Sequence, residues 1–571
     1  MTNTGRCCVL GCVLAGFFGG ALAWAQETSF EPVTDAMIQD PDPVDWLNWR
    51  RTLDGWGYSP LDQINRDNVH QLGLVWSWTM TPGLSQATPI VYDGVMYLPN
   101  PLNVVQAIDA RTGDLLWEYR KQFERSPDDS FRARTRSIAI YDDKIYLNTN
   151  DAHIVALDAR TGAVVWDHTV ADNRLGYRYT SGPIVVSGKI VAGMTGCERY
   201  KDGTCFISAH DPQTGAELWR TSTVAQPGDP GGDSWGDLPA TFRAGGDAWI
   251  PGSYDPGTNL MYWSTSQAKP WARLSRATDG DALYTNSVIA LDIENGEMQW
   301  YFQVVPEDNW DMDSPYESTL IDMVINGVVR KVLIHTSKIG WGVVLDRETG
   351  QFLHSFRTAF DNLIMSWTEE GRPVFNPDQI PTLADVDSEK TFEVCPHYHG
   401  ARNLNSPSYS PLTGLYYMGL NNSCMDVNFV SDEPGGFYAG MRASRVKMVP
   451  GYDYVGEFVA FDPVTGARQW EYRQPSGAAM TAAALATGGG IVFGGAADRR
   501  FFALDADTGA ALWEMRLNGD ISGAPVSFEV EGKQYVAVGA GGRIAQTTSY
   551  ARLTGEDIPQ GSGVIWVFAL P

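Results

Sequence analysis

Apolar and polar positions follow one pattern that recurs along most of the chain. In residues 156–166, ALDARTGAVVW, an apolar stretch ends at Asp158, a polar turn carries Thr161 and Gly162, and a second apolar stretch ends at Trp166. Asp can accept hydrogen bonds from turn amides and Gly tolerates positive φ, so each copy predicts a β-hairpin. Because a lone hairpin cannot bury its faces in water, the copies must stack against one another.

Seven copies place an Asp eight residues before a terminal Trp or His. They are Asp109/Trp117, Asp158/Trp166, Asp211/Trp219, Asp292/Trp300, Asp346/His354, Asp462/Trp470 and Asp505/Trp513. Most neighbouring copies are 43–54 residues apart, close to the length of a four-stranded propeller blade. The long interval between Asp346 and Asp462 leaves room for a degenerate blade around residues 409–420, YSPLTGLYYMGL. We therefore predict an all-β, eight-bladed β-propeller with tryptophans packed between neighbouring blades.

Length and charge narrow the class of protein. The chain has 571 residues, is 43% hydrophobic, and carries a formal net charge of −26. Such an acidic chain is not expected to bind nucleic acid, and it favours basic partners such as small electron carriers. A repeat that runs through nearly the whole length predicts a single domain over residues 26–571 rather than several.

The N-terminus has the pattern of a secretory signal peptide over residues 1–25. Arg6 precedes an apolar run, and small residues at Ala23 and Ala25 precede Gln26. The apolar run is too short for a comfortable membrane span, and no other long apolar stretch occurs. We therefore expect an exported protein without a transmembrane segment.

Cysteine usage agrees with export. Three of the seven cysteines fall in residues 1–25, and the other four are Cys197, Cys205, Cys395 and Cys424. An even number in an exported chain indicates disulfides. Local pairing, 197–205 and 395–424, is the simplest of the three possible connectivities. No CxxCH motif is present, so a covalently attached c-type haem is not expected.

Three loop segments carry residues that could hold a cation. Glu198 follows a predicted strand, Gln267 follows another, and Asp311 and Asp313 lie two residues apart in NWDMD. On an extended segment two such acids point to the same side. Taken singly, each is an ordinary loop residue. A propeller brings equivalent loops of different blades together at its axis, and hard cations need several oxygen ligands from converging loops.

The Asp-x-x-Thr-Gly-x-x-x-Trp repeat resembles that of the quinoprotein alcohol dehydrogenases, over residues 45–570. Further similar segments are YSPLDQINRDNV (58–69), GSYDPGTNLMYW (252–263), LYTNSVIALD (283–292) and PEDNWDMD (306–313). QAKPW (267–271) resembles a subgroup that includes sorbose and related sugar or alcohol dehydrogenases. The resemblance implies an eight-bladed propeller that binds pyrroloquinoline quinone (PQQ) and one metal ion. It also implies a periplasmic enzyme that oxidises an alcohol or small sugar and passes electrons to a separate carrier, such as a basic cytochrome c.

The same resemblance implies roles for individual residues. Asp311 matches the catalytic base, and Lys338 matches a cation near the quinone oxygens. The implied metal ligands are Glu198, Gln267, Asp311 and Asp313, with Gln267 in place of the family's Asn. The implied PQQ contacts are Arg136, Thr180, Ser181, Thr195, Gly196, Cys197, Trp249, Lys338 and Asn403. Family members with the Asp-x-Asp pattern use a lanthanide(III) ion, and those with a small second residue use Ca²⁺.

Two departures from the family pattern concern the cofactor. Residues 130–137, SFRARTRS, lack the adjacent cysteines whose disulfide often covers PQQ in the family. Gln267 is one methylene longer than the Asn it replaces, which changes the reach of the implied metal ligand. The alternative function is a non-enzymatic β-propeller scaffold of the cell envelope. A scaffold has no need of Glu198, Asp311, Trp249 and Lys338 together.

Overall fold

The computed structural model describes residues 30–571 except 84–85, 124–133, 199–202, 277, 432–439, 444–445, 543–544, 557–558 and 560. The predicted signal peptide, residues 1–25, lies outside the described residues. Contacts divide the chain into Pro32–Pro571, which is one compact unit, and Met1–Glu31.

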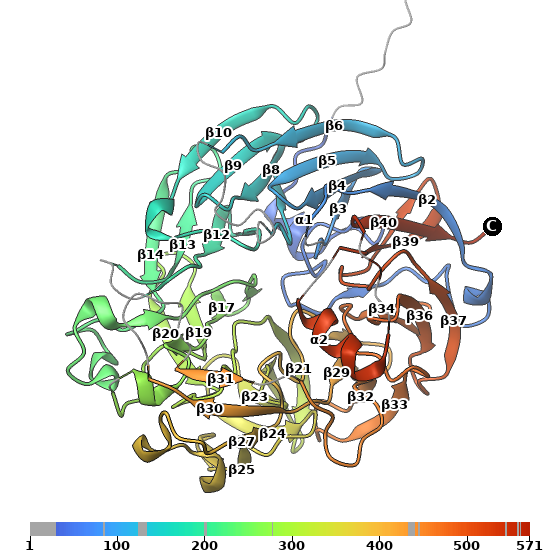
Figure 1. Cartoon of the computed structure of the whole chain (residues 1–571). Coiled ribbons are helices and arrows are strands. Elements are labelled where there is room, and N and C mark those ends of the chain that lie inside the picture. Colours follow the sequence, from blue (N-terminus) through green and yellow to red (C-terminus); the bar gives the residue numbers. More distant parts are fainter. Residues whose placement is uncertain are drawn as a thin grey trace, which may run out of the picture. The chain divides into compact units, whose positions relative to one another are not determined.

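The compact unit is built from antiparallel four-stranded sheets arranged around a common centre (Figure 1). In chain order the first four are β3 (Ile90–Tyr92), β4 (Val95–Asn100), β5 (Val104–Asp109), β6 (Leu115–Arg120); β7 (Ala139–Tyr141), β8 (Lys144–Asn148), β9 (His153–Asp158), β10 (Val164–Thr169); β11 (Ile184–Val186), β12 (Lys189–Gly193), β13 (Phe206–His210), β14 (Glu217–Ser222); and β16 (Ser253–Asp255), β17 (Leu260–Ser264), β19 (Ser287–Asp292), β20 (Met298–Gln303). The next three are β21 (Ser318–Ile325), β22 (Val328–Thr336), β23 (Trp341–Asp346), β24 (Phe352–Arg357); β28 (Ser408–Ser410), β29 (Leu415–Asn421), β32 (Gly456–Phe461), β33 (Arg468–Arg473); and β34 (Leu485–Thr487), β35 (Ile491–Gly495), β36 (Arg500–Asp505), β37 (Ala511–Arg516). A short strand, β1 (Tyr58–Ser59), pairs in parallel with β34.

The last sheet joins the two ends of the compact unit. Its strands are β38 (Val526–Val530), β39 (Lys533–Ala540), β40 (Val564–Ala569) and β2 (Gly73–Thr79). Trp76 in β2 donates a hydrogen bond to the carbonyl of Ala110 at 3.1 Å, as a repeat tryptophan would. The sheet that has no copy of the repeat is therefore completed by pairing of the first and last long strands.

The interval between Asp346 and Asp462 does not contain a further four-stranded sheet among its described residues. Residues 409–420 form the β28–β29 hairpin, which belongs to the same sheet as the Asp462 copy. The extra length instead forms small sheets, made by β25 (Ile364–Trp367), β26 (Pro373–Phe375), β27 (Phe392–Val394), β30 (Met425–Phe429) and β31 (Met441–Ala443). The prediction of a degenerate blade at 409–420 was wrong, because insertions lengthen this interval.

The repeat works as a docking device between neighbouring sheets. The carboxylate of Asp158 accepts a hydrogen bond from the amide of Thr161 at 2.9 Å and thereby closes the turn. Gly162 has φ +70°, and a Cβ there would lie 2.5 Å from the ring of Trp117 in the preceding copy. The Trp117 indole N–H donates to the Ala159 carbonyl at 3.0 Å. Each Trp therefore packs over the turn glycine of the next copy.

The same hydrogen bond recurs around the molecule, from each indole N–H to the carbonyl of the residue that follows the next Asp. The further pairs are Trp166–Pro212, Trp219–Ile293, Trp300–Arg347 and Trp470–Ala506. Trp513 donates instead to the carbonyl of Leu72, just before β2. Of the six repeat tryptophans, Trp219 is buried and the others are half-buried, so the expectation that each is buried between neighbouring blades is met by Trp219 alone. Each outermost strand lies at the rim, which leaves part of its indole in solvent.

We expect Trp219→Ala to lower the free energy of unfolding by about 3–5 kcal/mol, because it removes a buried indole and its hydrogen bond. Leu218→Ala is the matched control. Leu218 is the preceding residue of β14 and is 49% exposed, so its truncation should cost less than about 0.5 kcal/mol. Urea unfolding followed by tryptophan fluorescence measures both. Equal effects of the two substitutions would contradict the docking role.

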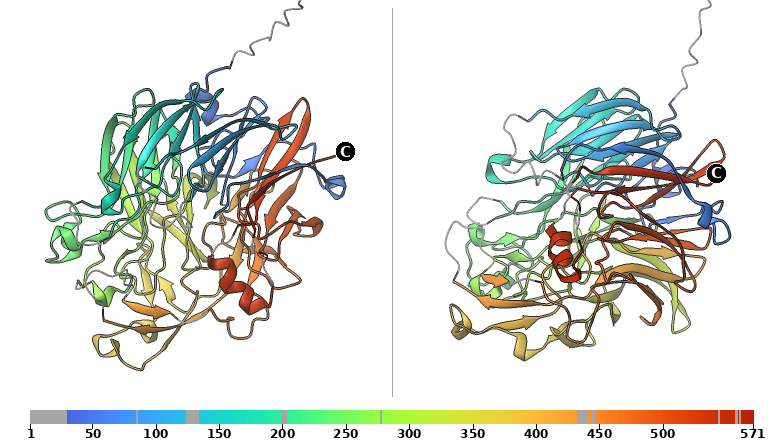
Figure 2. Two further views of the ribbon diagram at one scale, coloured as in Figure 1. Left: turned by 45° about the horizontal axis from the view of Figure 1, so that its top comes forward. Right: turned by 45° about the vertical axis from the view of Figure 1, so that its right-hand side comes forward.

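Disulfides join Cys197 to Cys205 and Cys395 to Cys424, which confirms the predicted local pairing. Two regular helices are described, α1 (Asp35–Gln39) and α2 (Ala545–Thr554). Neither they nor any other helix in the described part of the chain has the length and apolarity needed to cross a membrane. In the views of Figure 2, α2 lies near the middle of one face rather than at the outer rim.

Candidate active site

Many of the predicted site residues lie close together, at the same end of the strands in several sheets. A cavity of about 200 Å³ is lined by Arg134, Arg136, Arg178, Thr180, Thr195, Gly196, Glu198, Asp247, Trp249, Ser266, Gln267, Lys269, Trp271 and Asp313. Many of these residues precede the first strand of a sheet or follow its second strand. In an antiparallel sheet the start of the first strand and the end of the second strand lie at the same end of the sheet's strands. The topology therefore brings residues that are far apart in sequence to one cavity.

Lys338 lies between the two acids of the NWDMD segment. Its ammonium is 3.3 Å from Oδ2 of Asp311 and 2.7 Å from Oδ2 of Asp313, and it donates to the Asp311 carbonyl at 3.0 Å. Burial alone would lower the pKa of Lys338, but the two carboxylates outweigh burial and raise it. Burial raises the pKa of Asp311 well above its ordinary value, although Lys338 opposes that shift. Asp311 is thus a poorly solvated carboxyl group that depends on nearby cations.

A tight turn sets the direction of Asp311. The carboxylate of Asp308 accepts hydrogen bonds from the amides of Trp310 at 2.8 Å and Met312 at 2.9 Å. Asp311 adopts φ +63°, a left-handed conformation that Asp tolerates better than most residues. The segment is therefore turned at Asp311. This differs from the extended conformation that was expected from the sequence. Asp311 and Asp313 nevertheless share one lysine, because the turn rather than strand alternation brings them together.

Two buried oxygens in this region lack a protein donor. Within the described part of the chain, Oε1 of Gln267 and Oδ1 of Asp311 have no hydrogen-bond partner. The backbone N–H of Gln267 donates to Oδ1 of Asp313 at 3.1 Å, so Gln267 lies against the acids. Unpaired buried oxygens are costly, and amide and carboxylate oxygens are the ligands that hard cations prefer. These atoms fit the metal ion that the sequence resemblance implies.

Glu198 lies across the cavity, in an ion pair that the sequence analysis did not anticipate. The ammonium of Lys269 is 2.8 Å from Oε1 of Glu198 and 2.9 Å from Oδ2 of Asp247. Asp247 also accepts hydrogen bonds from the amides of Gly196 at 2.6 Å and Cys197 at 3.3 Å. Burial alone would raise the pKa of Asp247, but Lys269 and the amides of Gly196 and Cys197 together outweigh burial and lower it.

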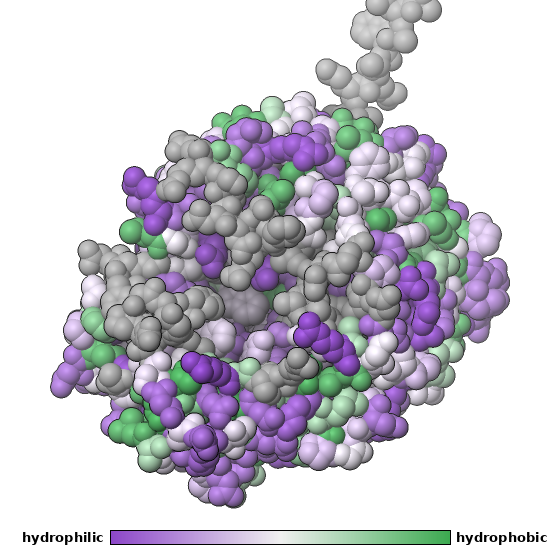
Figure 3. All heavy atoms as spheres, viewed as in Figure 1, coloured by the Kyte–Doolittle hydropathy of each residue, from purple (hydrophilic) through white to green (hydrophobic). Residues whose placement is uncertain are grey.

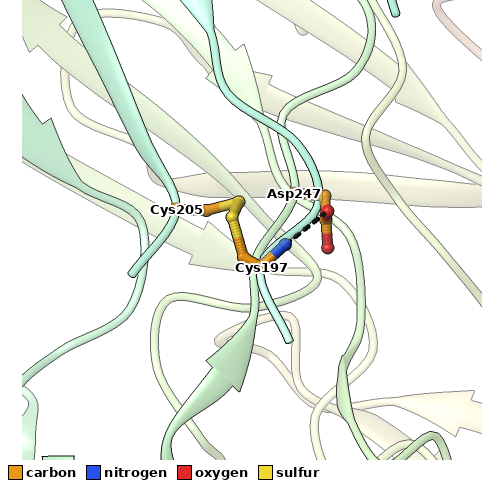
Figure 4. Close-up of side chains that lie close together, drawn as sticks. All are labelled: Cys197, Cys205 and Asp247. Atoms are coloured by element: carbon orange, nitrogen blue, oxygen red, sulfur yellow. Dashed lines mark hydrogen bonds between the residues drawn. A yellow bond between two sulfur atoms is a disulfide. The ribbon is translucent and has the colours of Figure 1, made fainter. Parts of the chain in front are cut away.

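Figure 4 shows how Asp247 approaches the Cys197–Cys205 disulfide from the adjacent segment. The two sulfurs and a carboxylate oxygen of Asp247 lie within 4.8 Å of one another. Because both sulfurs are joined in the disulfide, they cannot serve as thiolate ligands, and this group is not a metal centre. Its role is structural, since Asp247 fixes the loop that carries Glu198.

Trp249 and Arg136 form another part of the cavity wall. The Arg136 guanidinium lies 5.5 Å from the centre of the Trp249 ring and donates to the carbonyls of Thr180 and Trp249 at 3.1 and 3.3 Å. Its third partner is the side-chain oxygen of Gln86 at 3.0 Å. Burial lowers the pKa of Arg136 well below its ordinary value. Within the described residues, the hydrogen-bond partners of this buried guanidinium are all neutral, which favours an anionic ligand beside a flat aromatic surface. PQQ, with its carboxylates and fused rings, fits this wall.

Four of the predicted cofactor residues, Cys197, Ser181, Asn403 and Lys338, lie outside the cavity lining. Cys197 is tied into the disulfide, and Ser181 lies 3.4 Å from the hydroxyl of Ser137. Asn403 donates to the carbonyl of His399 at 3.0 Å and lines a small neighbouring cavity with His399 and Tyr550 of α2. Asp311 is not in the lining either, but Asp311 and Lys338 both adjoin it through Asp313.

Sequence reasoning missed Asp247, Lys269 and Tyr316. Tyr316 packs edge-on against Trp249, with ring centres 5.5 Å apart. Asp247 in GGDAW offers no recognisable signal. Lys269 does, because QAKPW places a lysine two residues after the implied ligand Gln267, in an otherwise apolar and aromatic stretch.

Comparisons with known proteins agree on one family. The model of the PQQ glucose/ethanol/alcohol dehydrogenase β-propeller domain matches residues 46–359 and 472–536. Quinohemoprotein alcohol dehydrogenase ADH-IIG of Pseudomonas putida is 34% identical over 88% of this chain and 73% of its own length. Quinoprotein alcohol dehydrogenase PedH of Pseudomonas putida is 33% identical over 94% of this chain and 93% of its own. The solved structure of a europium-containing methanol dehydrogenase has a TM-score of 0.84 at 28% identity, covering 94% of this chain and 100% of that one.

Proposed function

The chain belongs to the PQQ-dependent alcohol dehydrogenases of the β-propeller type, and from that premise we propose which residues carry its reaction. It is an oxidoreductase that oxidises an alcohol with PQQ and a metal ion, a lanthanide(III) or Ca²⁺. The observation that carries the proposal is the pairing of buried Asp311 with Lys338 beside the cavity. Removal of a proton from a substrate hydroxyl requires a carboxylate with an available oxygen, and a fixed cation beside that carboxylate favours its ionised form.

The fold that supports this site is proposed to be a closed ring of eight blades, each one of the four-stranded sheets. Two features favour closure. The first and last long strands, β2 and β40, pair with each other, and Trp513 of the last repeat binds the Leu72 carbonyl just before β2.

PQQ would be held between Trp249 and the surrounding polar residues. When bound, PQQ accepts two electrons from the substrate, and the metal ion polarises the quinone as a Lewis acid. Trp249 supplies a flat apolar surface, and Arg136 supplies a positive charge for a carboxylate. Further proposed contacts are Thr180, Ser181, Thr195, Gly196, Cys197, Lys338 and Asn403.

Asp311 is proposed to be the base. Its Oδ1, which lacks a donor in the described structure, accepts the proton of the substrate hydroxyl while hydride leaves the carbon that bears this hydroxyl. Lys338 opposes the effect of burial on the pKa of Asp311, so it favours the ionised base, and it stabilises negative charge that develops nearby. Tight packing around Asp311, which is 4% exposed, limits access of water to the carboxylate.

The metal would be bound by Glu198, Gln267, Asp311 and Asp313. A third carboxylate, from Asp313, favours a trivalent ion, because attraction to each carboxylate grows with ionic charge. We therefore propose a lanthanide(III) in preference to Ca²⁺. The structural relative that contains europium supports this choice.

The substrate, electron acceptor and location are proposed from the relatives and the charge. A relative from Thauera butanivorans is named 1-butanol dehydrogenase (cytochrome c), and it is 33% identical over 90% of this chain. A net charge of −26 suits a basic cytochrome c as the acceptor. Hydrophilic residues are spread over the face in Figure 3, among smaller apolar groups. Small alcohols or sugars are the proposed substrates, and the predicted signal peptide supports the periplasm.

Reconstitution tests this function directly. Metal-free chain loaded with PQQ should gain a bound-quinone absorption band and should reduce a dye with ethanol or 1-butanol after La³⁺ is added. Asp313→Ala should abolish the response to La³⁺, because the trivalent ion loses a carboxylate. Activity with Ca²⁺ alone, unchanged by Asp313→Ala, would contradict the lanthanide proposal. Failure to bind PQQ with either ion would contradict the proposed site.

A further inference from the structure

Lys269 is held rigidly at the edge of the cavity. It belongs to β18 (Ala268–Lys269), which pairs with β15 (Ala244–Gly245), and Lys269 lies opposite Ala244. The Lys269 side chain is 13% exposed and reaches the carboxylates of both Glu198 and Asp247. With carboxylates 2.8 Å and 2.9 Å from its ammonium, Lys269 places a positive charge directly beside Glu198.

The two acids that Lys269 bridges are not equivalent. Asp247 is buried and accepts hydrogen bonds from the amides of Gly196 and Cys197, so its position is fixed without help from a metal. The Glu198 side chain is 41% exposed and lines the cavity, and among the described residues its carboxylate pairs with Lys269 alone. Glu198 can therefore turn to a metal ion while Lys269 stays anchored on Asp247.

The charges of the neighbouring side chains show how Lys269 affects a cation bound at this site. Four carboxylates, those of Glu198, Asp247, Asp311 and Asp313, adjoin two ammonium groups, those of Lys269 and Lys338. The formal charge of this group is −2, and without Lys269 it is −3. The arginines of the cavity wall are left out of this sum, because they would balance the carboxylates of PQQ. An ammonium beside a metal ligand repels a bound ion in proportion to the charge of that ion.

We propose that Lys269 is a metal-selectivity residue, which lowers the affinity of the site for any cation at Glu198 and penalises a trivalent ion more than a divalent one. This inference rests on the proposed function, since it assumes that Glu198 is a metal ligand. Lys269 opposes Asp313, which favours the higher charge. The preference of this site is then set by the balance between one extra carboxylate and one extra ammonium. Lys269 is a positioning residue and does not take part in the reaction.

The test compares ion affinities rather than activity. Full-length chain, loaded with PQQ and freed of metal, is titrated with Tb³⁺ and with Ca²⁺ by calorimetry. Lys269→Gln removes the charge but keeps an N–H donor for Asp247. Because repulsion scales with ionic charge, a tenfold gain in Ca²⁺ affinity should accompany about a thirtyfold gain for Tb³⁺. Lys269→Met is made in parallel, because it keeps the apolar stem and provides a second neutral side chain if the first variant fails to fold.

Two controls separate charge from structure. Lys269→Arg keeps the cation and should leave the ratio of Tb³⁺ to Ca²⁺ affinity within about twofold of the unsubstituted chain. Lys144 is a buried lysine that pairs with Asp142 and Asp143 in another sheet, so Lys144→Gln should change neither affinity. An unchanged ratio in folded Lys269→Gln and Lys269→Met, or a loss of Tb³⁺ affinity, would overturn the inference. If the unsubstituted chain binds PQQ and supports dye reduction in that case, the proposed function stands and only the role of Lys269 fails.

Discussion

Asp311→Asn should keep bound PQQ and lose about 10²–10⁴-fold in kcat. Asn has nearly the shape of Asp, and its oxygen can still face the cavity, but an amide does not accept the hydroxyl proton. Trp249 and Arg136 lie elsewhere in the wall, so they should retain the cofactor. The absorption spectrum of the purified variant reports bound PQQ, and steady-state dye reduction at saturating alcohol reports kcat.

The matched control for this substitution is Asp279→Asn. Asp279 is fully exposed and has one distant ion pair, 3.8 Å from Arg273, so its neutralisation should leave kcat unchanged. A near-normal kcat in Asp311→Asn with PQQ bound would show that another group accepts the proton. Loss of PQQ from Asp311→Asn would point to a binding role instead.

Lys338→Met should lower kcat by about 10²–10³-fold, the range for removal of one fixed donor at a developing charge. It should also destabilise the fold by about 3–5 kcal/mol, because Asp311 and Asp313 are then left buried without their shared cation. Dye-reduction kinetics and urea unfolding measure the two effects separately. Lys338→Arg keeps the charge and should recover most of the stability.

Lys331→Met serves as the control on the neighbouring strand. Lys331 lies in β22 and pairs with Glu348 at the surface, 2.9 Å away, so it should affect neither kcat nor unfolding. If Lys338→Met destabilises the chain but keeps its kcat, then Lys338 is a structural counter-charge and not part of the reaction. The two readouts therefore distinguish the roles.

The repeat was readable from the sequence because its function is local. The Asp of each turn binds amides two or three residues away, and the Gly and Trp have fixed spacing from it. The sheet formed by β38, β39, β40 and β2 was not readable in this way. Its members, β2 and β40, are nearly 500 residues apart, and no turn motif links them. Trp76 lacks the Asp that precedes the other repeat tryptophans by eight residues, so the repeat pattern does not identify it.

The site was readable only in part, and for a physical reason. Asp311, Glu198 and Trp249 belong to segments that resemble a known family, so their proximity could be inferred. The ion pairs of Lys269 and Lys338 depend on distances between loops of different sheets, which no spacing encodes. The left-handed turn at Asp311 depends on hydrogen bonds that the amides of Trp310 and Met312 donate to the Asp308 carboxylate. That turn replaced the alternation expected from an extended segment.

Pairing of β2 with β40 also ties folding to the order of synthesis. Strand β2 leaves the ribosome well before its partner β40, which follows after a delay on the order of tens of seconds at typical elongation rates. Until then Leu74 and Val75, both exposed in the finished fold, flank an unpaired strand edge. A nascent chain therefore cannot pair β2 with β40 until β40 has been made. During that interval the unpaired edge is open to chaperones and to mispairing with other chains, and the sheet is completed only when β40 is available.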